Sequence, residues 1–262
     1  MLELTIISSL LGLSLGSFVN VCVYRFPRGI SVVSVQSFCP HCRKRIRIVE
    51  LIPVIGFLVS GGRCKSCGAS ISFLYPIIEL LVAGVAVFVF YQNGISIRAF
   101  ELLIYFLLML TIALIDWKHF IISNQIIIFG LISGFLIKSL LGNTALMEGI
   151  VSSFLSFITL LVVMLLGNFF LKKQSMGIGD LKLAAVIGLF LGYQDFIITL
   201  WLAAICGAIY AFIINLKSDN SKLETQNSII PFGSFLAAVS FFIFFFQQQF
   251  DGFLDAWLIS NL

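Results

Sequence analysis

Four acidic residues lie within or beside apolar segments of the chain: Glu79, Glu101, Asp116 and Asp180. Asp116 ends one apolar run, and Asp180 precedes another within Gly177-Ile178-Gly179-Asp180-Leu181-Lys182. Ionisable groups at such places are costly, so each is a candidate for a functional role. Two carboxylates in a partly dry site share one proton, because both cannot ionise cheaply. The ionised carboxylate accepts a proton from water, and the protonated one gives its proton to a carbonyl oxygen, which predicts peptide hydrolysis.

The glycines beside Asp180 fit this chemistry, but each aspartate also has a purely structural interpretation. Gly177 and Gly179 allow the backbone to leave the helical conformation and to approach a substrate strand closely. Alternatively, Asp180 caps the N-terminus of a helix, and Asp116 forms an interfacial ion pair with Lys118. The case for catalysis therefore depends on whether the elements bring the two aspartates together.

Four cysteines form a second chemical pattern, in Cys39-Pro40-His41-Cys42 and Cys64-Lys65-Ser66-Cys67. Two CxxC pairs separated by 21 residues predict a tetrahedral four-thiolate site, because each short turn presents two sulfurs to one metal. We expect zinc, with iron as the alternative, and a structural role, because four protein ligands leave no open position. Two disulfides, or four cysteines without a metal, are the other interpretations of the pattern.

The composition indicates which elements must position these residues. Of the 262 residues, 60% are hydrophobic and only 11% are charged, which excludes most soluble folds and also intrinsic disorder. We predict an all-α polytopic membrane protein with about eight transmembrane helices and a cytoplasmic four-cysteine zinc-knuckle loop. The candidate spans are roughly Leu4–Tyr24, Phe73–Tyr91, Ala99–Ile115, Gln125–Leu141, Ile150–Leu171, Leu181–Tyr193, Phe196–Leu216 and Phe232–Gln248. Because only a short polar stretch separates the sixth from the seventh, seven spans with one broken helix is the alternative.

The basic residues predict the orientation in the lipid bilayer. The first span lacks a positive N-terminal flank but is followed by Arg25 and Arg28, which favours an uncleaved anchor with its N-terminus outside. Eight spans then place 14 of the 16 lysines and arginines inside, and only Arg98 and Lys138 outside. This asymmetry explains the basic loop without a nucleic-acid partner. The third span ends inside and the sixth begins inside, so Asp116 and Asp180 are expected at the same membrane face.

The pattern divides the chain into a first anchor (1–24), a cytoplasmic zinc-binding loop (25–72) and a transmembrane core (73–262). The whole sequence resembles the bacterial prepilin peptidases, the type IV leader peptidase family, nearly from end to end. The resemblance rests on Gly16-Ser17-Phe18-Val19-Asn20-Val21, Arg25 and Pro27, the two CxxC pairs, Leu51-Ile52-Pro53, Tyr75-Pro76 with Glu79, Asp116 to Asn124, Gly177 to Lys182, and Pro231-Phe232-Gly233. Ser123 and Ser234 stand where proline is common in the family, and Ser175 stands where glycine is common.

The resemblance implies a peptidase that removes the basic leader of prepilins and pseudopilins at the cytoplasmic face of the bacterial inner membrane. It implies Asp116 and Asp180 as the catalytic pair, with Asn124, Gly177, Gly179 and Lys182 supporting the active-site loop. Many members also N-methylate the new N-terminus with S-adenosylmethionine, an activity linked to the zinc-binding loop. Gly62 and Arg63 match the Gly-Lys/Arg pair of the family in that loop and are candidates for methyl transfer.

Other functions also fit parts of the pattern. A member with peptidase activity alone would keep the aspartates without methyl transfer. A non-enzymatic assembly factor would use its zinc loop to dock a partner, and a transporter would use the acidic residues as ion sites. A general intramembrane aspartic protease would share the glycine–aspartate motif but not the four cysteines.

Overall fold

The computed structural model describes residues 2–33, 35–172, 176–217 and 231–260, without the side chains of 171, 215, 217 and 248–260. Three residues used in the sequence analysis lie outside this described part of the chain: Ser175, and the basic residues Lys173 and Lys222 that were counted as inside. Every named element of the described chain is a helix, as expected. The elements are α1 (Leu2–Arg25), η1 (Phe26–Arg28), η2 (Ile48–Leu51), α2 (Ile55–Ser60), α3 (Leu74–Asn93), α4 (Ile97–His119), α5 (Asn124–Leu141), α6 (Asn143–Leu171), α7 (Ile178–Leu191), α8 (Tyr193–Lys217) and α9 (Phe232–Ser260).

Six of these helices are long and apolar enough to cross a membrane, namely α1, α3, α4, α5, α6 and α8. Two further apolar helices are shorter: α7 has 14 residues, and the apolar part of α9 covers Phe232–Gln247. The helices α7 and α8 are separate, because the chain turns at Gly192, whose φ of 91° is disfavoured for residues with a side chain. A multi-pass helical membrane protein is therefore confirmed, with six long spans among the described residues.

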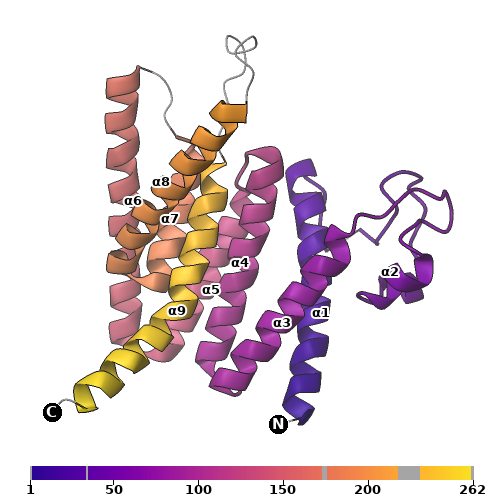
Figure 1. Ribbon diagram of the computed structural model, residues 1–262, viewed down its shortest axis with the longest axis horizontal. Helices are drawn as coiled ribbons and strands as arrows, with labels where there is room; N and C mark the ends of the chain where they lie inside the picture. The colour runs from indigo at the N-terminus through magenta and orange to yellow at the C-terminus, as the bar shows by residue number, and fades with distance from the viewer. Residues whose placement is uncertain (1, 34, 173–175, 218–230, 261–262) are drawn as a thin grey trace. The chain divides into compact units, whose positions relative to one another are not determined.

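The chain forms two compact units, residues 1–103 and 104–262. In the first unit, α1 lies beside α3 (Figure 1). The contact surface of α1 contains Gly12 and Gly16, one helical turn apart, and a β-carbon at Gly12 would lie 2.5 Å from the Cα atom of Ala83. Small residues at this spacing let two backbones approach closely, which is how helices associate in lipid.

The polar loop follows α1 and is joined to its end by Arg25, which is buried. The guanidinium of Arg25 donates hydrogen bonds to four backbone carbonyls, those of Ser31, Val32, Val35 and Gln36. Isolated antiparallel bridges, Phe38 with Arg45 and Arg63 with Ser70, close one tight turn around each CxxC pair. The loop thus contains two similar knuckles.

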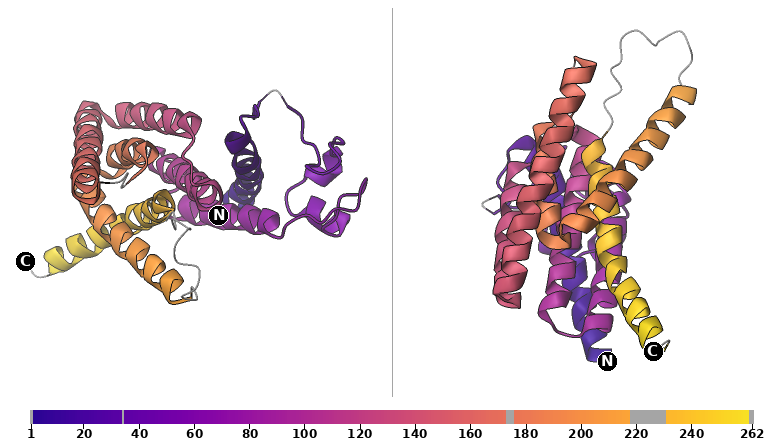
Figure 2. Two further views of the ribbon diagram at one scale, coloured as in Figure 1. Left: turned by 90° about the horizontal axis from the view of Figure 1, so that it is seen from above. Right: turned by 90° about the vertical axis from the view of Figure 1, so that its left-hand side faces the viewer.

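In the second unit, α7 packs against α5, α6, α8 and α9 (Figure 2). Nearly all of its side chains from Leu181 to Leu191 are buried. Gly188 fits against Ser152 and Ser156 of α6, and the ring of Phe190 contacts that of Tyr105 on α4. The helix that begins beside Asp180 is therefore surrounded mainly by protein.

Candidate functional site

Asp116 and Asp180 lie together in the second unit. Asp116 is near the C-terminal end of α4, Asp180 is in the first turn of α7, and both are buried. A β-carbon built on Gly233, at the start of α9, would lie 3.0 Å from Oδ2 of Asp116 and 3.1 Å from Oδ1 of Asp180. The sum of these distances places the two oxygens at most about 6 Å apart. The pairing expected from the order of the spans is thus present in the structure.

The N-terminus of α9 holds Asp116 in place. Ser234 donates its backbone N–H to Oδ2 of Asp116 at 2.7 Å, and its hydroxyl lies 3.0 Å from the same oxygen. The hydroxyl also lies 3.0 Å from the backbone carbonyl of Ala113. A hydroxyl has one hydrogen and two acceptor positions. It can therefore donate to an ionised Asp116, or donate to Ala113 while accepting a hydrogen bond from a protonated Asp116.

Asp180 has a structural contact in addition to its place beside Asp116. The backbone N–H of Asp180 donates a hydrogen bond to the carbonyl of Gly177, the residue that precedes α7, at 3.2 Å, and a β-carbon on Gly177 would lie 3.6 Å from Oδ2 of Asp180. A carboxylate in the first turn of a helix lies near the positive end of the helix dipole, which is compatible both with a structural role and with a role beside Asp116. No ion pair joins Asp116 to Lys118 within the described part of the chain, and Lys118 is exposed.

The supporting residues named from the sequence gather at the same end of the second unit. Nζ of Lys182 donates a hydrogen bond to Oδ1 of Asn124 at 2.8 Å, which joins α7 to the start of α5. A β-carbon at Gly179 would lie 3.0 Å from Cβ of Ile122, so glycine there permits close packing against the segment after α4. Gly177 is extended, whereas Gly179 already belongs to the first turn of α7.

Gly233 and Ser234 were not among the site residues named from the sequence. Both lie in the first turn of α9, next to the aspartates. The sequence did contain a signal for these two residues. Proline followed closely by glycine and serine is typical of a helix start, and the eighth expected span begins at the membrane face where the aspartates are expected. That pattern predicts a helix terminus, but it does not predict which carboxylate accepts the free N–H.

The four cysteines of the first unit also form a cluster. The Sγ atoms of Cys39, Cys42, Cys64 and Cys67 lie within 4.8 Å of one another, and those of Cys39 and Cys67 are 3.9 Å apart. Four sulfurs bound to one zinc at about 2.3 Å would be about 3.8 Å apart. Backbone hydrogen bonds from Ser66 and Cys67 lower the pKa of the Cys64 thiol to about 7. Despite a backbone hydrogen bond from Ala69, desolvation and the neighbouring thiols raise the pKa of Cys67 to about 11, so Cys64 is the first of the two to form a thiolate. The cluster therefore fits a four-thiolate metal site.

The pair named for methyl transfer lies beside this cluster. Gly62 has a φ of 66°, and a β-carbon there would lie 3.1 Å from the Phe57 ring, so glycine suits both the backbone and the space. Arg63 is exposed to solvent and lines a cavity between the loop, α1 and α3. The structure thus places Arg63, but not the aspartate pair, at this cavity.

These features define a multi-pass membrane protein with a buried aspartate pair and a four-cysteine loop. Comparison with protein families gives the same result for both parts of the chain. Residues 10–93 match the Bacterial Peptidase A24 N-terminal domain, and residues 103–212 match the Type IV leader peptidase family. The chain belongs to the type IV leader peptidase family, an aspartic peptidase family, as the sequence motifs had suggested.

Relatives in several bacteria are similar over most of their length, and each is named prepilin leader peptidase/N-methyltransferase. The Bacillus subtilis protein is 32% identical over 241 residues, which cover 91% of this chain and 92% of the relative. The proteins of Pseudomonas putida and Pseudomonas aeruginosa are each 29% identical, covering 88% and 92% of this chain and 86% and 89% of the relatives. A comparison with solved structures gave no match.

Proposed function

We propose that this protein removes the leader peptide of type IV prepilins or pseudopilins by a two-aspartate mechanism. The observation that carries the proposal is the position of Gly233 in α9. It lies beside both Oδ2 of Asp116, from α4, and Oδ1 of Asp180, from α7. Asp116 accepts the backbone N–H of Ser234 at the start of α9, and Asp180 lies in the first turn of α7. Helix N-termini stabilise negative charge, so the site can hold one ionised carboxylate in a largely apolar environment.

The mechanism uses one proton shared by the pair. The apolar helix of the substrate packs among the spans, with its scissile bond beside Asp116 and Asp180. The ionised carboxylate takes a proton from water as the water attacks the peptide carbonyl carbon, and the other carboxylic acid protonates the carbonyl oxygen. The proton then passes to the leaving amine when the tetrahedral intermediate breaks down.

We place the protein in the bacterial inner membrane with eight spans, the N-terminus outside and both candidate sites facing the cytoplasm. The two shorter helices, α7 and α9, complete the eight. The asymmetry of lysine and arginine supports this orientation. Substrate, enzyme and bilayer then meet at the cytoplasmic face, where the leader remains after its apolar helix has entered the membrane.

The cysteine cluster would hold zinc through Cys39, Cys42, Cys64 and Cys67. Zinc bound by four thiolates has no free coordination position, so its contribution is to hold the two knuckles together. We assign the second activity, N-methylation of the new N-terminus with S-adenosylmethionine, to the first unit, where Gly62 and Arg63 lie. The names of the relatives support this assignment.

The decisive experiment is substitution of each aspartate in the full-length protein. Asp116→Asn and Asp180→Asn should insert into the membrane and remain folded, but leader cleavage should fall at least about a hundredfold, because the acid–base pair is lost. Cleavage is followed by mass spectrometry of a prepilin reconstituted with the enzyme. Glu148→Gln, an exposed acid on α6, is the matched control and should cleave normally.

Normal cleavage by either aspartate variant would refute the mechanism. If both variants retained function in the cell while the cysteine variants lost it, the assembly-factor interpretation would be favoured instead. Folding of each variant is checked by size-exclusion chromatography in detergent, so a loss of activity is not confused with a loss of structure.

A further inference from the structure

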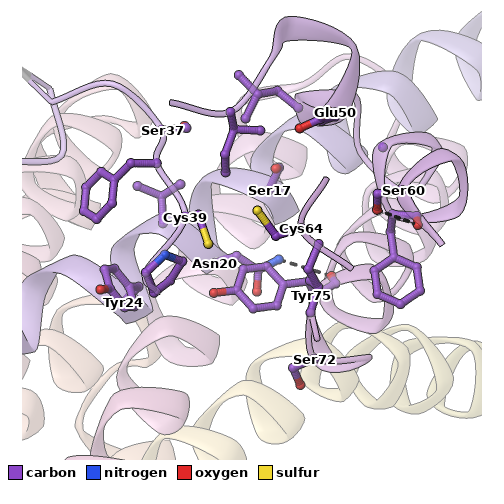
Figure 3. A pocket seen from close by; sticks show the side chains of 18 of the residues that line it. Ser17, Asn20, Tyr24, Ser37, Cys39, Glu50, Ser60, Cys64, Ser72 and Tyr75 are labelled. Carbon is purple, nitrogen blue, oxygen red and sulfur yellow. Dashed lines mark hydrogen bonds between the residues drawn. The ribbon is translucent and has the colours of Figure 1, made fainter. Parts of the chain in front are cut away.

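The segment between the two knuckles has two different faces. Its elements η2 and α2 pack against each other at Gly56, where a β-carbon would collide with the backbone carbonyl of Glu50. One face borders the cavity between the loop, α1 and α3, and Figure 3 shows Glu50 and Ser60 at the wall of this cavity. The other face, which we call the outer surface, does not line the cavity and consists of Ile48, Val49, Ile55, Leu58 and Val59.

All five residues of the outer surface are aliphatic, yet the described part of the chain leaves them uncovered. Ile48 is 84% exposed and Leu58 is 69% exposed. Ile55, Leu58 and Val59 have the i, i+3, i+4 spacing that places them on one side of α2. A helix on the surface of a soluble domain turns its apolar side inward, so the outer surface indicates contact with a further apolar body.

Two contacts hold α2 near the level at which α3 begins. The backbone N–H of Val54, the residue before α2, donates a hydrogen bond to Oε2 of Glu79 at 2.7 Å. Glu79 lies about 7.5 Å along α3 from its first residue, and helical side chains point back towards the N-terminus. The rings of Phe57 and Phe73 lie 5.1 Å apart, and Phe73 directly precedes α3. Because Leu74–Asn93 is a candidate span, α2 lies near the level at which this span would enter the lipid.

The charges around the outer surface favour a membrane with acidic lipids. Residues 26–73 include seven lysines and arginines but a single acidic residue, Glu50. Arg47 directly precedes η2 and Arg63 follows soon after α2, and both are exposed. Basic residues beside an apolar surface are typical of segments that lie in the interface of membranes with anionic headgroups. Since the candidate spans α1 and α3 border the loop on both sides, a bilayer is always within its reach.

We propose that the outer surface of η2 and α2 inserts into the interface of an acidic lipid leaflet, with Arg47 and Arg63 beside lipid phosphates. The aliphatic side chains enter the border between headgroups and acyl chains, while the opposite face stays turned towards the cavity. The four-cysteine cluster is thereby held at the membrane surface. This attachment needs neither leader cleavage nor a particular direction of insertion, so its tests are independent of the proposed peptidase.

Fluorescence quenching in nanodiscs that each hold one full-length molecule tests the contact with lipid. Leu58→Trp places an indole on the outer surface, and the control Ser66→Trp places one at an exposed position of the second knuckle. The emission of the native tryptophans is subtracted with the unaltered protein. In lipids with brominated acyl chains, the added emission should fall at least about twofold for Leu58→Trp and much less for Ser66→Trp. Equal quenching of the two, or no quenching of Leu58→Trp, would overturn the proposal.

Hydrogen exchange in the same nanodiscs gives a second test that needs no added indole. Leu58→Glu puts a charge at a position that the protein itself leaves exposed, so an α2 that faces only water would tolerate it. Since these discs contain neither a second copy nor substrate, lipid is the only available cover. If lipid covers Leu58, the carboxylate should detach the segment, and the α2 amides should exchange at least about tenfold faster. Ser66→Glu is the matched control and should leave these amides unchanged. Unchanged exchange in Leu58→Glu would overturn the proposal.

The lipid composition separates the apolar part of the attachment from its electrostatic part. Nanodiscs of phosphatidylcholine alone are compared with nanodiscs that also contain phosphatidylglycerol. Quenching of Leu58→Trp should be stronger in the acidic discs, and salt at about 1 M should remove the difference by screening the charges. Equal quenching in both lipids at low salt would overturn the role given to Arg47 and Arg63.

Discussion

Ser234 contacts Asp116 through both its backbone N–H and its hydroxyl. Proline is common at this position in the family that the sequence resembles, and proline has neither an N–H nor a hydroxyl. Members of the family with proline there lack both contacts, so we expect the contacts of Ser234 with Asp116 to assist leader cleavage without being essential for it. We expect Ser234→Ala to slow leader cleavage by about tenfold, the loss of one hydrogen bond to a charged group, and not to abolish it.

The test uses three variants and a readout that structural damage would not reproduce. Ser234→Thr keeps a hydroxyl and should restore most of the cleavage rate, whereas Ser133→Ala removes a buried hydroxyl that bonds only to its own helix and should have no effect. The rate is measured at several pH values, because only a group that contacts Asp116 should change the shape of the profile. Identical profiles for Ser234→Ala and the unaltered protein would show that the hydroxyl has no such influence.

For single residues, the sequence predicts which charged side chains belong to the candidate site, but it does not predict the uncharged residues that contact them. Asp116 and Asp180 are conspicuous because acids are rare in an apolar chain, and the order of the spans places both at one face. Gly233 has no side chain to mark it, and Ser234 acts partly through its backbone. Their roles depend on the distance between α9 and α4, which no local pattern contains.

Gly12 and Gly16 determine how closely α1 approaches α3. Gly12→Leu would force the side chain into the backbone of α3 at Ala83, so we expect it to destabilise the first unit by about 1–3 kcal/mol. Gly84→Leu is the matched control, because a β-carbon at Gly84 has no neighbour within 4 Å among the described atoms. Thermal unfolding in detergent should show a lower midpoint for the first variant and an unchanged one for the second.

The two knuckles depend on the metal that we assign to the four cysteines. Single Cys→Ser substitutions at Cys39, Cys42, Cys64 or Cys67 should release zinc and increase the susceptibility of the loop to proteases, because the bound metal would be what joins the two knuckles. His41→Ala should retain zinc, because His41 is not in the cluster. Metal content is measured by mass spectrometry of the purified protein. Full zinc content in a Cys→Ser variant would contradict the assignment.

At the scale of elements, hydropathy predicts the helices but not their limits. The sixth apolar segment was expected to begin at Leu181, whereas α7 begins at Ile178 and includes Asp180 in its first turn. Hydropathy fails here because a carboxylate in the first turn of a helix is stabilised by the positive end of the helix dipole, despite its charge. The break at Gly192 was visible in the sequence only as a short polar stretch, which suits a kink and a turn equally well.

The orientation of the whole molecule can be tested with its own basic residues. The loop contains a run from Arg43 to Arg47, and Arg98 lies in the first turn of α4, on the opposite side of the membrane in our topology. Trypsin should therefore cut within 43–47 in inverted inner-membrane vesicles but leave the loop intact in spheroplasts. Cleavage of the loop in sealed spheroplasts would reverse the orientation and move both candidate sites to the outer face.

The division into two compact units at residues 103 and 104 was not expected from the sequence. The boundary lies within α4, shortly after Arg98 and Glu101, where the helix itself continues without a break. Sequence patterns locate the polar loop and the spans, which are local properties. They do not reveal which spans pack together, because apolar side chains facing lipid and those facing protein are alike in composition.

The length of α7 has a consequence for the place where the peptide bond is cut. Fourteen residues rise only about 21 Å, against about 30 Å for the hydrocarbon layer of a bilayer. Because α7 is enclosed by other helices, it need not match the thickness of the lipid. In the eight-span arrangement, α7 then covers only part of the hydrocarbon layer, with Asp180 at its cytoplasmic end. In that arrangement we expect leader cleavage to become slower in thicker bilayers, because the difference in length between α7 and the hydrocarbon layer increases.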